Sequence, residues 1–457
     1  MTYLIIWAAL IIMFERAMYC GYVVDDDGMY NSLKNVKKTW SSHYIWSALY
    51  GCGFFKNAKQ EHLFTIVLHG INCSLIYKIT GSLLAALLYL FNPINNQTTL
   101  WLNGRRYAFS VLAVLLAWSF WPLAPFMAVF CGWLHVTGIT FPLLFLFTPF
   151  WWAVPFAGAA AGFVGYKKIR DHIKYRAAAF NHGSEYQKIS WKKLIIYVKT
   201  IGFSFVNCVF PNKPGMYHNF LYYYSQTEEG NKDAYSFNFE FWKGIAVLGF
   251  LAYDHSFWAF WFVLFISQWC GIYTVTMNMS DRYCSLPNVG VMMLLATYIG
   301  KLPAPYNMAV AAGFLVFYAV KYQLLFIAYR NVENFHLYHI NLFPDGINAR
   351  FFLSKIYIAR KDVYQAFGVI RQGMRYRPYD FKLLLGFIEC LFVLGKTKSA
   401  LKAMDFTEKH VPYGEEEDTK NLFDGIRKQF KSEYNSIHEV EKKYNKFRKS
   451  RLHGIKG

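Results

Sequence analysis

Long hydrophobic runs separated by short polar segments dominate the chain up to Arg330. About eleven of these runs approach the roughly 20 residues that an α-helix needs to cross a bilayer. They lie at residues 3–24, 62–80, 82–94, 106–120, 122–138, 139–152, 153–166, 240–254, 256–277, 286–300 and 306–330. We therefore predict an all-α, polytopic helical membrane bundle of about eleven spans. Between residues 118 and 166 the runs abut, which leaves their own number open.

Two longer polar stretches, residues 25–61 and 167–239, are predicted as large loops. An odd number of spans that starts from a cytoplasmic N-terminus places both loops and the chain's tail on the outer side. Basic residues in the second loop then oppose the usual positive-inside bias. These are Lys167, Lys168, Arg170, Lys174 and Arg176. Later in that loop, residues 191–206 space lysines and apolar residues as on a helix lying in the membrane interface.

The amino-acid composition also indicates a membrane protein. Apolar residues make up 55%, aromatic residues 20% and charged residues 17%, which argues against a soluble enzyme. The net charge of +20 suits anionic lipid headgroups or lipid phosphates better than nucleic acid. The eight cysteines are scattered without a CxxC pair or a histidine at ligand spacing. The cysteines therefore indicate neither a disulfide framework nor a zinc site.

The basic tail, residues 331–457, contains a repeat. Ala366 and Ala400 are 34 residues apart, as are Pro378 and Pro412, and 34 residues is the tetratricopeptide period. Helix-packing and terminating positions fall at Leu353, Tyr357, Ala366 and Pro378, and then at Leu384, Leu391, Ala400 and Pro412. We predict a membrane domain over residues 1–330 and a tetratricopeptide-like helical tail over 331–457. Two unrelated helical hairpins are the alternative.

Three carboxylates, Asp25, Asp26 and Asp27, follow the first span directly. Mutual repulsion and partial desolvation should raise the pKa of at least one of them, which suits a general base or a cation site. A polar stop at the end of a helix is the simpler interpretation.

A second polar cluster, residues 91–106, separates the third and fourth runs. Asn96 offers hydrogen bonds to a sugar, Trp101 a stacking face, and Arg105 with Arg106 a pair of phosphate forks. Arginines that snorkel at a span boundary are the alternative.

Three weaker candidates complete the set. Arg282 stands beside an acid where a later run begins, a position that often serves only topology. Tyr217 and His218 follow a turn after the surface helix. His69 lies inside the second run, where a polar residue faces the bundle or a cavity, and where a packed, hydrogen-bonded histidine is the alternative.

The order of five motifs resembles that of a known family, although no single motif is diagnostic. The motifs are AspAspAsp at 25–27, HisGlyIleAsn at 69–72, AsnPro to AsnGlyArg at 92–105, LysThrIleGly to TyrHis at 199–218, and AspArgTyr to LeuPro at 281–287. With the tail repeats, they resemble the transmembrane-and-tetratricopeptide protein O-mannosyltransferases and their bacterial relatives. Those proteins belong to the GT-C membrane glycosyltransferases. The similarity runs in order over nearly the whole chain.

The resemblance implies a bundle that binds a polyprenyl-phosphate-linked sugar and passes the sugar to an acceptor hydroxyl on the outer or lumenal face. It assigns catalysis to Asp25 and Asp26, and donor phosphate binding to Arg105 and Arg282, with Arg106 beside them. The sugar and acceptor would meet Asp27, His69, Asn96, Trp101, Tyr217 and His218. The usual HisPro and ThrGluAla of the family are AsnPro at 92–93 and GlnThrThr at 97–99 here. These departures bear on the identity of the sugar or the acceptor.

The expected chemistry is simple, because phosphate is a good leaving group. Asp25 or Asp26 would accept the proton of the attacking hydroxyl, while Arg105 and Arg282 offset charge on the departing phosphate. In-line attack predicts inversion at the sugar carbon. No cofactor is expected, and the chemistry neither requires nor excludes a divalent metal ion.

The function has rivals of other classes. A lipid-linked sugar flippase or transporter would use the carboxylates for ion coupling and should show internal repeats across its spans, which we do not find. A scaffold would use only the tail. Within glycosyltransferases, the acceptor is either Ser or Thr of a surface or secreted protein, which the tail favours by analogy, or a glycolipid or polysaccharide. We expect a bacterial cytoplasmic membrane protein whose site faces the periplasm, or a lumen-facing protein of the endoplasmic reticulum.

Overall fold

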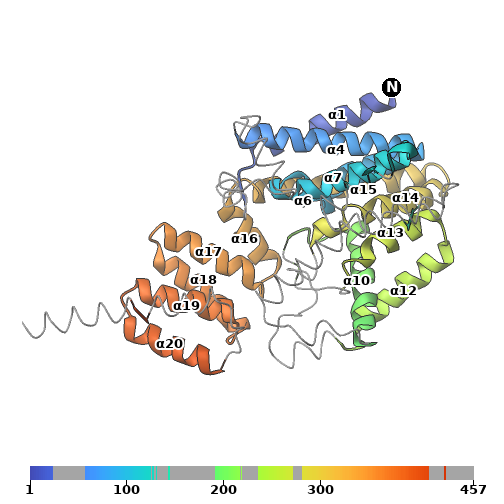
Figure 1. The fold of residues 1–457 in the computed structure, drawn as a ribbon. Coiled ribbons are helices and arrows are strands. Elements are labelled where there is room, and N and C mark those ends of the chain that lie inside the picture. The colour runs from blue at the N-terminus through green and yellow to red at the C-terminus, as the bar shows by residue number, and fades with distance from the viewer. Residues whose placement is uncertain are drawn as a thin grey trace, which may run out of the picture. The chain divides into compact units, whose positions relative to one another are not determined.

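The computed structural model describes residues 1–23, 57–124, 126–127, 130, 143–144, 191–216, 218, 235–270, 280–410 and 427–428. All regular secondary structure in these ranges is helical (Figure 1). The described residues fall into two compact units, the first ending at Ala349 and the second beginning at Arg350. Each unit is described by itself.

The first unit is a bundle of helices joined by short 3₁₀ turns. Its α-helices are α1 (Thr2–Phe14), α4 (Ala58–Thr80), α5 (Leu83–Phe91), α6 (Asn96–Thr99), α7 (Arg105–Ser119), α10 (Trp191–Val209), α12 (Phe239–Asp254), α13 (Phe257–Ser267), α14 (Pro287–Gly300), α15 (Tyr306–Ala328) and α16 (Val332–Leu342). Its 3₁₀ turns are η1 (Glu15–Tyr19), η2 (Pro93–Asn95), η3 (Leu102–Gly104), η4 (Trp121–Leu123) and η8 (Asp281–Cys284).

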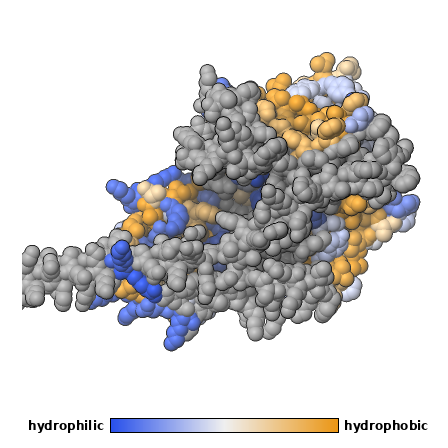
Figure 2. Space-filling model, in the orientation of Figure 1, coloured by the Kyte–Doolittle hydropathy of each residue, from blue (hydrophilic) through white to orange (hydrophobic). Residues whose placement is uncertain are grey.

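Three described helices are long and apolar enough to cross a membrane. They cover Thr2–Tyr19, Ala58–Thr80 and Tyr306–Ala328. Large apolar side chains on them stay exposed, with Ile12 80% and Val316 63% accessible. Figure 2 shows hydrophobic surface at the top of the view, where Figure 1 places α1. A helix that is apolar all round and keeps part of that surface uncovered is typical of contact with lipid.

Other predicted spans form shorter helices within the described residues. α5 has 9 residues, α13 has 11, α14 has 14, α7 has 15 and α12 has 16. The second and third spans also differ from their predicted limits of 62–80 and 82–94. Asn57 caps α4, which begins at Ala58, and α5 stops at Phe91 before the AsnPro pair. The runs between residues 122 and 166 lie almost wholly outside the described residues, so the span count stays a prediction.

The helix predicted at the membrane interface packs inside the protein instead. α10 lies against α12, and at their crossing a Cβ on Gly202 would come within 2.5 Å of the Cα of Gly244. The two glycines therefore let the backbones approach closely. Polar side chains of α10 are turned inward, since Lys199, Thr200 and Ser204 are at most 1% exposed. The periodicity was that of a helix, but Lys199, Thr200 and Ser204 are buried within the protein.

The second unit is built from two successive helix pairs. Its helices are α17 (Ile347–Ala359), α18 (Val363–Tyr376), α19 (Phe381–Val393) and α20 (Thr397–His410). The first helices of the two pairs start one tetratricopeptide period apart, at Ile347 and Phe381, and so do the second helices, at Val363 and Thr397. The turn inside each pair also repeats, because Lys361 (φ 65°) and Gly395 (φ 71°) both adopt the left-handed conformation. The described helices thus carry the period seen in the sequence.

Equivalent positions of the two pairs are packed alike. Ala366 and Ala400, each on the second helix of its pair, are both buried. The backbone N–H groups of Asp362 and Lys396 close the two turns by donating to the carbonyls of Tyr357 and Leu391, at 2.8 and 2.9 Å. The local sequence therefore specifies the same hairpin twice. Pro412, which would end the second repeat, lies outside the described residues.

Candidate functional site

The polar segment 91–106 folds as three short helical turns between α5 and α7. Asn92 starts it by accepting from the N–H of Ile94, and Pro93 begins η2, where its missing N–H costs no hydrogen bond. Gly104 closes the segment, because a Cβ there would overlap the carbonyl oxygen of Gln97. The segment is consequently a compact, buried polar segment, and Asn95, Asn96, Gln97 and Thr99 have no exposed surface.

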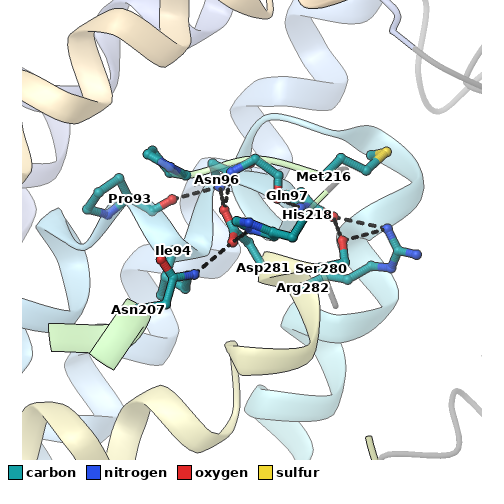
Figure 3. A network of polar contacts seen from close by, with 12 residues as sticks. Pro93, Ile94, Asn96, Gln97, Asn207, Met216, His218, Ser280, Asp281 and Arg282 are labelled. Carbon is teal, nitrogen blue, oxygen red and sulfur yellow. Dashed lines mark hydrogen bonds and ion pairs between the residues drawn. The ribbon is translucent and has the colours of Figure 1, made fainter. Parts of the chain in front are cut away.

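Asp281, in η8, is the centre of the hydrogen-bond network to which this polar segment belongs (Figure 3). Its Oδ2 accepts from Asn96 Nδ2 and from the backbone N–H of Gly215, both at 2.6 Å. Its Oδ1 accepts from Asn207 Nδ2 at 3.2 Å and from His218 Nε2 at 2.6 Å. Asp281 has no exposed surface. Four donors from three parts of the chain, segment 91–106, α10 and segment 212–218, therefore satisfy one buried carboxylate.

Arg282 points away from its neighbour Asp281. Its Nη1 donates to Gln97 Oε1 at 3.1 Å and to Ser280 Oγ at 3.0 Å, and its Nη2 donates to the hydroxyl of Tyr283 at 3.3 Å. The guanidinium also lies over the ring of Trp101, 5.3 Å from the ring centroid. These contacts fix the position of a guanidinium that is 6% exposed.

Gln97 joins the Arg282 side of the network to the segment 212–218. While its Oε1 accepts from Arg282 and Ser280, its Nε2 donates to the carbonyl of Gly215 at 2.9 Å. One side-chain amide therefore connects the cation to the segment that ends at His218.

Segment 212–218 is also held from α16. The backbone N–H of Met216 donates to His339 Nε2 at 2.9 Å, and His339 Nδ1 donates to the carbonyl of Phe335 at 2.8 Å. These two bonds require the neutral ring, and burial lowers the pKa of His339 to about 3. A Cβ on Gly215 would come within 2.9 Å of that ring. The glycine lets the segment lie directly on the histidine.

α15 and the residue that follows it contribute tyrosines to the polar segment 91–106 and to the end of α10. The hydroxyl of Tyr322 shares a 2.8 Å hydrogen bond with Thr99, and that of Tyr329, directly after α15, donates to Asn96 Oδ1 at 2.7 Å. One turn before Tyr322, Tyr318 donates to the carbonyl of Val209 at 2.8 Å. A helix of membrane-spanning length is thus bonded to the residues around Asp281.

Arg105 and Arg106 have different partners among the described residues. Arg105 forms a buried ion pair with Glu61 of α4, and its Nε donates to the carbonyl of Leu102. Tyr22 donates to the same glutamate at 3.0 Å. Arg106 bonds instead to the side chain of Asn103. The charge of Arg105 is therefore opposed by an acid that the sequence had not singled out.

His69 is a packed histidine of α4. Its Nε2 lies 3.2 Å from the carbonyl oxygen of Leu90, and its ring contacts those of Phe14 and Tyr89. None of its described contacts is with Asp281 or Arg282. The alternative of a hydrogen-bonded core histidine describes this position.

The structure unites some of the predicted site residues. Asn96, Trp101, His218 and Arg282 belong to one network, whereas Arg105, Arg106 and His69 are bonded elsewhere. Asp25, Asp26, Asp27 and Tyr217 lie outside the described residues. Comparisons with family models, with curated proteins and with solved structures find no match for this chain.

Sequence reasoning missed the partners that hold the site together. These are Glu61, Asn207, Tyr329 and His339, together with the central role of Asp281. Each is a polar residue within or beside an apolar helix, where a buried polar group must find a partner. That signal identifies them as bonded, but it does not say to what.

Proposed function

We propose that the chain is a polytopic membrane glycosyltransferase of the GT-C type. It takes a sugar from a polyprenyl-phosphate donor and transfers it, with inversion, to an acceptor hydroxyl. One observation carries the proposal: three segments on which the resemblance rests, 91–106, 213–218 and 280–283, meet in a single buried network around Asp281 and Arg282. The three helices long enough to cross a membrane fit a lipid-linked donor.

Arg282 is the donor-phosphate ligand in this proposal. A guanidinium held rigidly by Gln97, Ser280 and Trp101 meets a phosphate at a smaller entropic cost than a mobile one. Charge-assisted bonds to phosphate oxygens also strengthen where water is excluded. Arg105 contributes less directly, since Glu61 already opposes its charge.

The reaction also needs a proton acceptor, which the resemblance assigns to Asp25 or Asp26. The attacking hydroxyl loses its proton as its oxygen bonds to the anomeric carbon, and the bond from that carbon to the phosphate oxygen breaks. The electron pair leaves with the polyprenyl phosphate, whose charge Arg282 offsets.

The acceptor in this proposal is Ser or Thr of a surface or secreted protein. The support is the second unit, where two helix pairs follow one another at the tetratricopeptide period. We assign these pairs as tetratricopeptide repeats. The site faces the periplasm, or the lumen of the endoplasmic reticulum if the cell is eukaryotic.

Mass spectrometry of surface proteins and glycolipids, from cells with and without this chain, tests the function. We expect a hexose- or pentose-sized adduct on Ser or Thr to disappear without the chain. Restoring the chain as R282Q should leave at least about 99% of the adduct missing, since removing one such charge stabiliser typically costs 10²–10³ in rate. R330Q, at an exposed arginine, is the matched control and should restore it.

Two other outcomes are decisive. An adduct lost from a glycolipid alone would replace the protein acceptor by a lipid one. Identical adducts on proteins and lipids in both cell types would overturn the glycosyltransferase proposal.

A further inference from the structure

His218 and Asp281 form a buried histidine–carboxylate pair. The side chains are 3% and 0% exposed, and Nε2 lies 2.6 Å from Oδ1. The imidazole is held edge-to-face by the rings of Phe203 and Phe343, each with its centroid 5.4 Å away. Its orientation is therefore fixed by packing as well as by the hydrogen bond.

The hydrogen-bond pattern assigns the tautomer of the neutral ring. Asp281 accepts at Oδ1, so Nε2 of His218 carries the hydrogen, and the lone pair is on Nδ1. That Nδ1 has no hydrogen-bond partner among the described residues. His339 of α16, which bonds to segment 212–218, differs because both of its nitrogens are bonded to backbone groups. Of these two histidines, only His218 has a ring nitrogen whose lone pair can accept a proton from a substrate.

Asp281 itself is poorly placed to accept a further proton. Two donors already occupy each of its oxygens, which accounts for the lone pairs that a carboxylate offers. It can act only through a group bonded to it. Asn96, Asn207 and the Gly215 amide do not titrate, so that group is His218.

The pair belongs to the same network as the cation. Gln97 bonds to Arg282 through Oε1 and to the carbonyl of Gly215 through Nε2, and Gly215 in turn donates to Asp281. Figure 3 shows Gln97, His218 and Arg282 close together around Asp281 and Ser280. A proton acceptor and a phosphate ligand thus come from one rigid cluster, as group transfer from a phosphate requires.

We propose that Nδ1 of His218 accepts the proton of the acceptor hydroxyl, with Asp281 as the positioning residue. This inference rests on the proposed function and moves the role of the base from Asp25 or Asp26 to His218. As the hydroxyl oxygen bonds to the anomeric carbon, its proton passes to Nδ1. The bond from that carbon to the phosphate oxygen breaks, and its electron pair leaves with the polyprenyl phosphate. Asp281 stabilises the resulting imidazolium.

The test compares variants of the full chain in proteoliposomes that contain a labelled polyprenyl-phosphate sugar. In H218Q the amide nitrogen of glutamine can still donate to Asp281, but the proton acceptor is gone. We expect a loss of kcat of about 10²–10⁴, the usual contribution of a general base, with binding of polyprenyl phosphate within about threefold of wild type. H255N, at an exposed histidine, is the control and should match wild type.

Chemical rescue separates a proton acceptor from a structural side chain. Added imidazole should restore transfer by H218A at least about tenfold while leaving R282Q unchanged, because only the first lacks a base. D25N and D26N are compared with H218Q in the same assay.

Each remaining outcome is assigned in advance. If H218Q transfers sugar at the wild-type rate, or D25N and D26N abolish transfer while H218Q does not, His218 is not the base. If H218Q loses donor binding, His218 is a donor ligand and the inference is wrong. Wild-type protein that transfers no sugar removes the proposed function, and this inference with it.

Discussion

The helix pairs of the second unit and the Asp281 network of the first are organised in opposite ways. In the helix pairs, turns and caps join residues a few positions apart, and the second pair has the same turn geometry and turn hydrogen bond as the first. In the network, Asn96 and Asp281 are 185 residues apart, and His218 and Asp281 are 63 apart. The structure of the helix pairs is therefore determined by residues close together in the sequence. The network forms only when segments far apart in the sequence pack together.

Replacing an aspartate in each region should give the largest contrast. Asp281→Ala leaves the donors of Asn96, Asn207, Gly215 and His218 buried without their acceptor, and should destabilise the first unit by about 3–5 kcal/mol. Asp380→Ala removes only the cap of α19, where the carboxylate accepts from the N–H groups of Lys382 and Leu383, and should cost about 1 kcal/mol.

The two units can be followed separately in unfolding experiments. Every tryptophan lies at or before residue 269, so tryptophan fluorescence in detergent follows the first unit alone. Hydrogen exchange of residues 347–410 follows the helix pairs. Equal costs for the two aspartate substitutions would contradict the distinction between distant and local organisation.

Acid should weaken the first unit through its buried histidines. Burial lowers the pKa of His336 to about 4 and that of His339 to about 3, from 6.5 in the unfolded chain. Above pH 6.5 both histidines are neutral in the folded and in the unfolded chain, so they do not reduce the free energy of unfolding. Below pH 6.5 they become protonated in the unfolded chain but stay neutral in the folded one. The free energy of unfolding then falls by up to about 1.4 kcal/mol per pH unit for each histidine.

Tryptophan fluorescence in urea titrations between pH 7 and 4.5 measures this slope. His339→Gln, which keeps an acceptor for the Met216 N–H, should make the slope shallower by about one histidine's share. A slope unchanged in that variant would mean that other groups govern the acid response.

The repeated turn predicts the smallest effects, of opposite sign in the two helix pairs. Lys361 and Gly395 occupy equivalent left-handed positions, but only glycine adopts that conformation without steric cost. Lys361→Gly should stabilise its hairpin by up to about 1 kcal/mol, and Gly395→Lys should destabilise the other by about the same amount. Hydrogen exchange of α17–α20 amides checks both, and effects of the same sign would show that the turns are not equivalent.

The same contrast explains what the sequence could predict. Local sequence was enough to predict the period of the tail and the helical class. It was also enough for the polar character of segments 91–106 and 280–287, because each of these features depends on residues close together in the sequence. The partner of Arg105 was not, since nothing near residue 105 points to Glu61. Charge patterning also misplaced α10, because Lys199 looks solvent-facing until Gly202 and Gly244 bring a second helix against it.

The tyrosines of α15 and its C-cap have a consequence for how the bilayer acts on the Asp281 network. Tyr318, Tyr322 and the C-cap residue Tyr329 bond this helix to the end of α10 and to the polar segment 91–106. A membrane helix adapts to bilayer thickness by changing its tilt. Where α15 crosses the membrane, such a tilt would displace the hydroxyls that hold Thr99 and Asn96, so a change in bilayer thickness would act on the Asp281 network.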